Sequence, residues 1–577
     1  MMKRIYGILF IAVVVARFSL AQMAVEKIDT AAISKIKDEG MNHSQVMEIL
    51  SYLSDVYGPR LAGSPEYKEA AEWVSQKLNS MGLQNIHFEK SAPVAKGWTL
   101  KQFSACVLQP RAFPLIAYPK AWSPGLKGTI TGDVVYLNVS TPEELSAYKG
   151  KLKGRLVLIS EPRELMAHFE PEAHRLSDAD LLRLANAGVQ EGRRLRRFPD
   201  FARMSPAERD SAIRAIAREF MPNADSATIA RMIARRMGGG QALVGAKLEF
   251  CQKEGAVAVL DEGRGDDGTV FVQSATVPQP AGTPFGQRVN AYDANAPQIL
   301  PQVTLAAEQY NRLVRVIEKG QKVRMEISLD VAFTPADSSF NVIGEIPGTD
   351  LKDEVVMLGG HLDSWHAGTG ATDDGAGVAA CMEAVRIIKA LGLQPRRTIR
   401  IGCWAAEEEG LLGSRSYVTQ HFGEQEGGGG PMGGGGGELR TKPEYDKLSV
   451  YFNHDNGTGK LRGVYLQGNE AARTIFRAWL APFASMGAST LSLQNTGGTD
   501  HLSFDGIGLP GFQFIQDPID YDARTHHSNM DVYDRIQPED MKQAATIIAA
   551  FVYNAAMMEQ KFPRKPMPTP QETSGRN

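Results

Sequence analysis

The stretch "GGHLDSWHAGTGATDDGAG", residues 359–377, holds two histidines and three aspartates among glycines. Imidazole and carboxylate groups are the ligands that Zn²⁺ takes in open, catalytic sites. His361 and Asp363 are two residues apart, so in an extended chain their side chains point to the same face. The stretch therefore predicts metal ligands at a point where a strand turns into a helix.

Further candidate residues each follow a strand-like run elsewhere in the chain. They are Asp373 and Asp374, Glu407, Glu408 and Glu409, Asp455, and His526 and His527. Taken singly, each has an ordinary explanation as a helix cap, a solvated turn or a structural histidine. Taken together, so many carboxylates in one place would repel one another, and buried charge is costly unless it is paired or bound to metal. Little that is basic lies nearby in sequence except the histidines and Arg524, so one or two divalent cations are the expected partners.

The surrounding pattern alternates apolar strand-length runs with helix-length runs. Expected strands are residues 355–360, 397–406, 449–455 and 511–515, and expected helices are residues 377–393 and 537–560. Apolar strands that alternate with helices predict a mostly parallel α/β sheet covered on both faces. In such sheets ligands collect at the carboxyl ends of the strands, which is where the candidate residues fall.

Length and composition allow several domains and exclude some classes of partner. At roughly 100–200 residues per domain, 577 residues predict two or three domains, and 43% hydrophobic residues suffice for their cores. A net charge of −3 gives no reason to expect nucleic acid or an anionic membrane surface as a partner.

Residues 1–21 have the pattern of a secretory signal peptide. Lys3 and Arg4 precede an apolar run, and Ser19-Leu20-Ala21 is a small-x-small cleavage site. The alternative is an N-terminal membrane anchor, but the apolar run is much shorter than the roughly 20 residues that span a bilayer. The sequence predicts a protein exported to the periplasm or the extracellular space, without stable membrane insertion.

Three other segments stand apart from the α/β pattern. Residues from about 164 to 240 are expected to be helical and are rich in arginine, which favours a solvated helical insertion over a basic binding patch. Residues 426–438, mostly glycine, predict a flexible surface loop. Residues 562–577, rich in Pro, Thr and Ser, predict a disordered tail.

The motifs "HLDS…DDGAG", "AAEEEGLLGS", "NHD" and "GTDHLSF…GIGLPGF" occur in this order at the expected junctions. The sequence resembles the co-catalytic zinc exopeptidases of metallopeptidase family twenty-eight. Within that family, "HLDSW" and "QKEGAVAVL" make it most similar to the group of plasma glutamate carboxypeptidase, or carboxypeptidase Q. The likeness covers most of the chain after the signal peptide.

The resemblance implies a domain plan. Residues 22–90 would be the N-terminal helical part of the peptidase domain, and residues 334–561 its zinc-binding catalytic part. Between them, residues 91–333 would form an inserted protease-associated domain, with the arginine-rich helices as an extra insertion at about 164–240. The implied fold is that of zinc exopeptidases, a mostly parallel mixed sheet flanked by helices.

The resemblance also assigns roles to residues at two Zn²⁺ ions per chain. The implied metal ligands are His361, Asp373, Glu408, Asp455 and His527, with Asp373 bridging the two ions. Glu407 would be the general base that takes a proton from water, and His526 would donate a hydrogen bond to the oxyanion. Asp363 would orient His361.

The implied activity is hydrolysis of a peptide bond near one end of a short peptide or dipeptide. Whether the enzyme is an aminopeptidase or a dipeptidase or carboxypeptidase stays open, because the motifs describe the metal site and not the substrate terminus. The sequence is compatible with a homodimer. Two other functions compete: a catalytically inactive receptor or scaffold, which should have lost ligands, and a glutaminyl-cyclase-like zinc enzyme, which would not need two metals.

Overall fold

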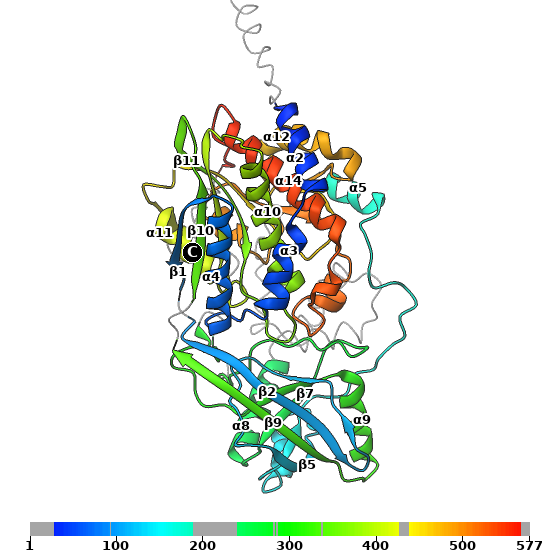
Figure 1. Ribbon diagram of the computed structural model, residues 1–577. Coiled ribbons are helices and arrows are strands. Elements are labelled where there is room, and N and C mark those ends of the chain that lie inside the picture. The colour runs from blue at the N-terminus through cyan, green and yellow to red at the C-terminus, as the bar shows by residue number, and fades with distance from the viewer. Residues whose placement is uncertain are drawn as a thin grey trace, which may run out of the picture.

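The computed structural model describes residues 28–566 except 93, 189–238, 281–282, 284–286, 336–338 and 426–437. The described chain forms two eight-stranded sheets, each with its own hydrophobic core (Figure 1). The predicted signal peptide, most of the arginine-rich insertion and nearly all of the glycine loop lie outside the described residues. Within the described part of the chain, no helix combines the length and the apolar character needed to cross a membrane.

The first sheet is mixed, with parallel strands at its centre. In spatial order its strands are β1 (Gln84–Lys90), β10 (Phe340–Ile346), β12 (Arg397–Trp404), β11 (Leu351–His361), β15 (Leu448–Asn453), β18 (Gly511–Gln516), β16 (Leu461–Tyr465) and β17 (Thr490–Ser492). Strand β11 pairs in parallel with β12 and β15, and β15 pairs in parallel with β18. All six residues of β15 are buried, as expected for a strand covered on both faces.

Helices cover both faces of this sheet. They are α2 (Thr30–Asn42), α3 (Val46–Ser51), α4 (Pro65–Ser80), α10 (Ala376–Ala390), α11 (Leu412–His421), α12 (Ala472–Leu480), α13 (His501–Asp505) and α14 (Pro538–Met557). Helix α10 lies between β11 and the helices α14, α2 and α3 (Figure 1). The prediction of an α/β fold with a mixed sheet flanked by helices is confirmed.

The second sheet belongs to an inserted unit, residues 96–335. Its strands, in spatial order, are β3 (Phe113–Pro114), β2 (Lys96–Gln109), β9 (Arg324–Pro335), β5 (Ile130–Tyr136), β6 (Leu156–Leu158), β7 (Ala258–Glu262), β8 (Gln302–Leu305) and β4 (Ala117–Pro119), with helices α8 (Gly239–Lys253) and α9 (Ala307–Glu318). The chain leaves the first sheet after β1 and returns at β10, and these two strands pair with each other. The long ribbon of β2 and β9 therefore connects the inserted unit to the first sheet (Figure 1).

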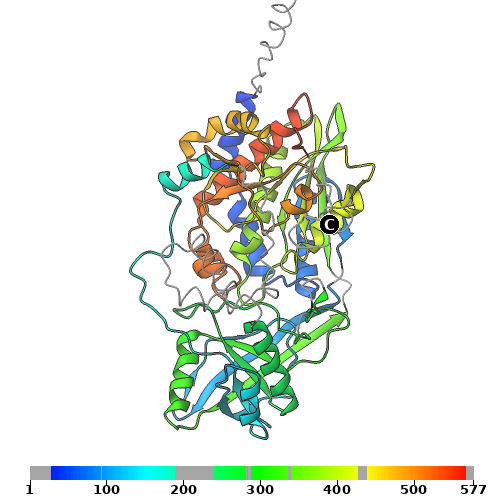
Figure 2. The same cartoon turned by 180° about the vertical axis from the view of Figure 1, so that it is seen from behind.

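One segment of the inserted unit crosses back to the first sheet. Residues 161–177, which we call the strap, lead from β6 to helix α5 (Asp178–Asn186), which packs on β17 (Figure 2). The Arg175 guanidinium lies 2.9 Å from the Asp517 carboxylate and 2.7 Å from that of Asp540. The strap contains no helix, so the expectation of a helical stretch from residue 164 is wrong for residues 164–177.

The start of the predicted disordered tail also needs correction. Phe562 is 3% exposed and packs on Phe476, and its backbone N–H donates to Ser449. The Phe562 side chain anchors the start of the tail to the core, which the Pro-rich composition of the tail did not predict. The four cysteines, all described, are unpaired, and Cys381 and Cys403 are buried among apolar side chains.

A buried arginine fixes the loop between β11 and α10. The Arg60 side chain is fully buried and donates hydrogen bonds to backbone carbonyls of Leu53, Leu362, Thr369 and Gly370. Burial lowers its pKa, but a guanidinium keeps its proton at any physiological pH. One side chain thus satisfies three carbonyls of this loop, which has no regular secondary structure, and one carbonyl of the π-helix Tyr52–Val56.

Replacing Arg60 by Met should therefore destabilise the fold. The substitution leaves buried carbonyl groups without donors, so we expect the free energy of unfolding to fall by about 3 kcal/mol. Urea unfolding measures this loss. Arg473→Met is the matched control: the Arg473 side chain pairs with Glu470, three residues earlier, at the surface, so the change should be below about 1 kcal/mol. Equal losses in the two variants would contradict the role given to Arg60.

Candidate metal centre

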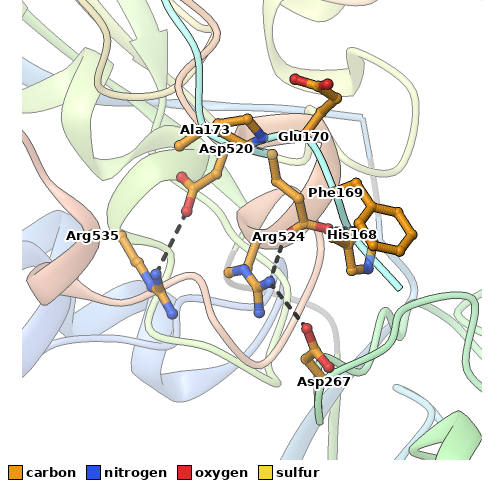
Figure 3. Close-up of a pocket in the computed structure, with 10 residues that line it drawn as sticks. His168, Phe169, Glu170, Ala173, Asp267, Asp520, Arg524 and Arg535 are labelled. Atoms are coloured by element: carbon orange, nitrogen blue, oxygen red, sulfur yellow. Dashed lines mark hydrogen bonds and ion pairs between the residues drawn. The ribbon is translucent and has the colours of Figure 1, made fainter. Parts of the chain in front are cut away.

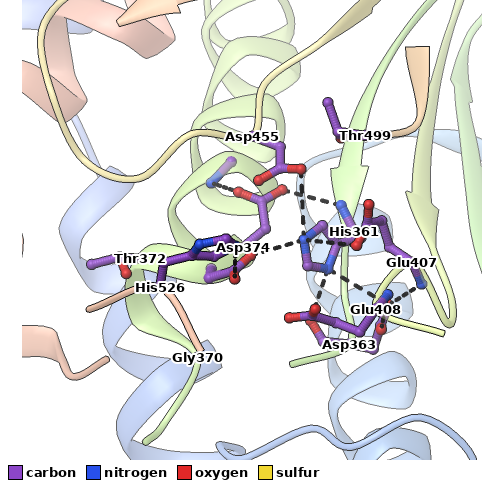
Figure 4. A network of polar contacts seen from close by, with 12 residues as sticks. His361, Asp363, Gly370, Thr372, Asp374, Glu407, Glu408, Asp455, Thr499 and His526 are labelled. Carbon is purple, nitrogen blue, oxygen red and sulfur yellow. Dashed lines mark hydrogen bonds and ion pairs between the residues drawn. The ribbon is translucent and has the colours of Figure 1, made fainter. Parts of the chain in front are cut away.

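Three of the predicted ligands, His361, Glu408 and Asp455, meet at the carboxyl ends of adjacent parallel strands (Figure 4). His361 is the last residue of β11, Glu407 and Glu408 follow β12, and Asp455 follows β15. Strand β11 lies between β12 and β15, so these side chains converge although their sequence positions span almost a hundred residues. Asp373 comes from the turn of π-helix η4 (Ala371–Gly375) that precedes α10.

Asp373 lies between two histidines. Its Oδ1 is 3.1 Å from Nε2 of His361, and its Oδ2 is 3.1 Å from Nε2 of His527. On one side, Nε2 of His361 is also 3.8 Å from Asp455. On the other side, Nε2 of His527 is 2.9 Å from Glu408. The five predicted ligands therefore form two His–carboxylate pairs that share the Asp373 carboxylate.

The electrostatics of this cluster favour bound cations. Burial raises the pKa of Glu408 to about 7, and the nearby Asp373 adds to the shift. Burial alone would lower the pKa of His527, but Glu408 and Asp373 outweigh it and raise the value to about 10. Glu408 Oε1 is buried without a hydrogen-bond partner. A buried group of excess acids around two histidines, with an unsatisfied carboxylate oxygen, fits divalent metal ions.

Glu407 lies beside the cluster without forming part of either pair. Its Oε2 is 3.9 Å from Nε2 of His361, and its side chain is 10% exposed (Figure 4). Burial, together with the carboxylate of Asp455, raises its pKa well above that of a free glutamate, although His361 opposes the shift. A buried carboxylate with a raised pKa at the edge of a metal cluster is suited to proton transfer.

The structure gives the Asp363 carboxylate a contact that the sequence did not suggest. Nδ1 of His361 is 3.0 Å from the backbone carbonyl of Asp363 and 3.6 Å from its carboxylate. The carboxylate accepts hydrogen bonds from the backbone N–H groups of Glu407 and Glu408, at 3.1 and 3.3 Å. Asp363 therefore contacts His361 mainly through its main chain, while its side chain fixes the start of the loop after β12.

His526 lies next to the cluster but farther from it than His527. Its Nε2 is 3.7 Å from Asp373 Oδ2, and its ring stacks on Tyr521 with centroids 4.7 Å apart. Burial lowers its pKa to about 4, so at neutral pH the imidazole is uncharged and carries one N–H. His526, Asp373 and His527 also form a group that could hold a metal ion, but the shorter contacts belong to His527.

Comparisons with known proteins agree with this geometry. Residues 341–552, which contain every predicted site residue, match the model of Peptidase family M28. This part of the chain, residues 341–552, is an M28 peptidase domain, called the M28 domain below. Carboxypeptidase Q of Homo sapiens is 25% identical over 535 residues, covering 92% of this chain and 90% of that protein. Aminopeptidase YwaD of Bacillus subtilis is 30% identical over 266 residues, 45% of this chain and 53% of that protein.

A solved structure has the same fold as the whole described chain. The peptidase M28 precursor of Shewanella amazonensis superimposes with a TM-score of 0.60 at 23% identity, covering 93% of this chain and 98% of that chain. The match bears out the predicted peptidase family for residues 341–552, and the superposition bears out the predicted fold. Neither the family match nor the superposition assigns roles to individual residues.

Two residues of the M28 domain, Trp365 and Asp374, make contacts at the site that the sequence did not predict. Trp365 donates a hydrogen bond from Nε1 to Glu408, 2.7 Å away. Asp374 accepts from the backbone N–H of His361 and of Gly377, which ties the end of β11 to the start of α10. Asp374 was noticed only as a neighbour of Asp373, and no spacing or periodicity marked Trp365 as a partner of Glu408.

A cavity of about 560 Å³ lies between the strap and the M28 domain (Figure 3), and none of the predicted metal ligands lines it. Two arginines line it, but both are paired with acids. Arg524 contacts Glu172 and lies 4.0 Å from Asp267, and Arg535 lies 3.6 Å from Asp520. Because their charge is already balanced, these arginines do not make the cavity an anion site.

A third His–carboxylate group lies near this cavity, in the inserted unit and the strap. It consists of His168, Glu172 and Asp266. The Asp266 carboxylate lies 2.9 Å from Nε2 of His168, and Asp266 raises the pKa of that histidine. Ion pairs among its own members, and between Glu172 and Arg524, account for this group without a metal ion.

Proposed function

We propose that the protein is an exported, zinc-dependent exopeptidase that hydrolyses short peptides or dipeptides. The observation that carries the proposal is the position of Asp373, whose two oxygens each face a different His–carboxylate pair. One carboxylate shared by two ligand sets is what a pair of adjacent cations requires. The export part of the proposal rests on the signal-like residues 1–21, and we propose the inserted unit as a protease-associated domain on the sequence resemblance.

The proposed ligands are His361 and Asp455 for one Zn²⁺, His527 and Glu408 for the other, and Asp373 for both. When bound, such a pair of ions lowers the pKa of a water molecule toward 7 and polarises the scissile carbonyl. Mixed imidazole and carboxylate donors suit Zn²⁺ with an open coordination position.

Two residues of the chain would act on the reacting atoms. The Glu407 carboxylate takes a proton from the attacking water and returns it to the leaving amine nitrogen. His526, uncharged at neutral pH, donates its N–H to the oxyanion that forms on the substrate carbonyl. Asp363 positions Glu407 and Glu408 by accepting hydrogen bonds from their backbone N–H groups.

The competing functions fit this geometry less well. An inactive receptor should lack ligands or the base, whereas all five ligands and Glu407 are present. A glutaminyl-cyclase-like enzyme would not need two metals, whereas here Asp373 faces two ligand sets. The substrate terminus is best decided by a panel of aminoacyl chromogenic substrates, free dipeptides and N-blocked peptides. Cleavage of dipeptides alone would identify a dipeptidase, and cleavage of N-blocked peptides would indicate carboxypeptidase action.

The protein purified without chelators should contain close to two zinc ions per chain, because its ligands form two sets that share Asp373. Elemental analysis of the native protein measures this ratio. A protein without zinc, and without activation by added Zn²⁺ or Co²⁺, would falsify the proposed function.

Glu407→Gln and Glu408→Gln should separate proton transfer from metal binding. Glu407→Gln should keep both zinc ions while kcat falls by about 10²–10⁴-fold, since general acid–base catalysis contributes that much. Glu408→Gln should lose zinc, because Glu408 is the carboxylate beside His527. Zinc content and kcat are measured on both variants, and the reverse pattern would exchange the two roles.

The neighbouring histidines should also behave differently. His527→Ala should lower zinc occupancy, because its Nε2 faces both Asp373 and Glu408. His526→Ala should keep both metals and the KM, while kcat falls by about 10²–10³-fold, the scale for losing one oxyanion donor. Metal analysis together with steady-state kinetics decides the matter; zinc loss confined to the His526 variant would show that the ligand is His526.

A further inference from the structure

The inserted unit reaches the metal centre through a short segment, residues 270–273. This segment runs beside residues 527–529 of the M28 domain. The backbone N–H of Val272 donates to the carbonyl of His527 at 3.0 Å, and the N–H of Asn529 donates to the carbonyl of Val270 at 3.2 Å. The side chain of Asn529 accepts from the N–H of Val270 at 2.7 Å. A proposed metal ligand is therefore held by main-chain contacts with the inserted unit.

A side chain of the same segment contacts the imidazole ring of His527. The amide nitrogen of Gln273 lies 3.0 Å from Nδ1, while Nε2 on the other side of the ring faces Asp373 and Glu408. His361 has the same arrangement, with its Nδ1 facing the carbonyl of Asp363. Each histidine thus presents one nitrogen to the ligand cluster and the other to a hydrogen-bonding group.

The chemistry of imidazole defines what the group at Nδ1 must do. A neutral histidine that binds a metal through Nε2 carries its proton on Nδ1, so Nδ1–H needs an acceptor. The nitrogen and oxygen of a glutamine amide exchange places by a half-turn about Cγ–Cδ, so Oε1 can occupy the position 3.0 Å from Nδ1.

We propose that Gln273 of the inserted unit is a positioning residue for the zinc ligand His527, its amide oxygen accepting the Nδ1–H hydrogen bond. The proposal rests on the proposed function, because it concerns one of the two zinc sites. It makes the metal centre a product of both units: the M28 domain supplies the ligands, and the inserted unit sets the tautomer and orientation of one of them. Gln273 is exposed, so replacing it removes a hydrogen-bonding group without opening a cavity in a core.

The test compares an acceptor with a non-acceptor at position 273 of the full mature chain. Zinc affinity is measured by competition with a chromogenic chelator. Gln273→Leu cannot accept a hydrogen bond and should weaken zinc binding at one of the two sites by about 10–100-fold, the usual scale for such partners. Gln273→Glu offers a carboxylate acceptor and should bind zinc as tightly as the wild type or more tightly.

Gln252→Leu is the matched control. Gln252 is also an exposed glutamine of the inserted unit, and its amide donates to the carbonyl of Gln298, so its loss should leave zinc affinity unchanged. The kcat of Gln273→Leu should recover toward the wild-type value in excess zinc, as expected for a residue that acts through the ligand. Thermal unfolding in the presence of a chelator should be the same for all three variants.

Two results would overturn the proposal: wild-type zinc affinity in Gln273→Leu, or weakening in Gln273→Glu as large as that in Gln273→Leu. The first would mean that backbone contacts alone hold His527, and the second that the amide does not serve as an acceptor. Failure of the proposed function looks different, because the wild-type chain itself would then bind no zinc.

Discussion

The structure is organised around a repulsion: several carboxylates are buried together at one edge of a sheet. Asp374 shows the cost, because burial and then the neighbouring Asp455 raise its pKa well above that of a free aspartate. Such a group persists only where the surrounding chain is held firmly and positive charge is supplied. Arg60 holds the loop after β11, and Asp374 ties that strand to α10, so both contacts keep the acids in place. The start of α10 also packs closely on the chain after β15, because a Cβ added at Gly377 would lie 1.9 Å from the carbonyl oxygen of His454.

The sequence predicted the parts of this arrangement that depend on local pattern. Apolar runs such as residues 355–360 and 449–455 indicated strands, and buried parallel strands must align their carboxyl ends at one edge. The positions of His361, Asp455 and Glu408 near one another follow from that rule. The division of the ligands into two pairs around Asp373 does not follow from it, and came from the family resemblance.

Contacts between distant segments could not be predicted in this way. Arg60 lies 302 residues before Leu362, and Gln273 lies 254 residues before His527, and neither belongs to a periodic pattern or a motif. The prediction of a helix in the strap failed for a related reason. Its composition is compatible with a helix, but Arg175 is held by Asp517 and Asp540 of the first sheet's unit, so tertiary contacts decide its conformation.

The inserted unit contacts the rest of the molecule at several places. Among them are the β2–β9 ribbon, the segment of residues 270–273 beside His527, the strap with α5 on β17, and a hydrophobic cluster in which Trp122 packs on Trp365. A unit attached only through the β2–β9 ribbon could rotate about that ribbon, whereas the contacts at the other places restrain this rotation. Residues 270–273 therefore stay beside His527, so the inserted unit forms a fixed wall on that side of the ligand cluster.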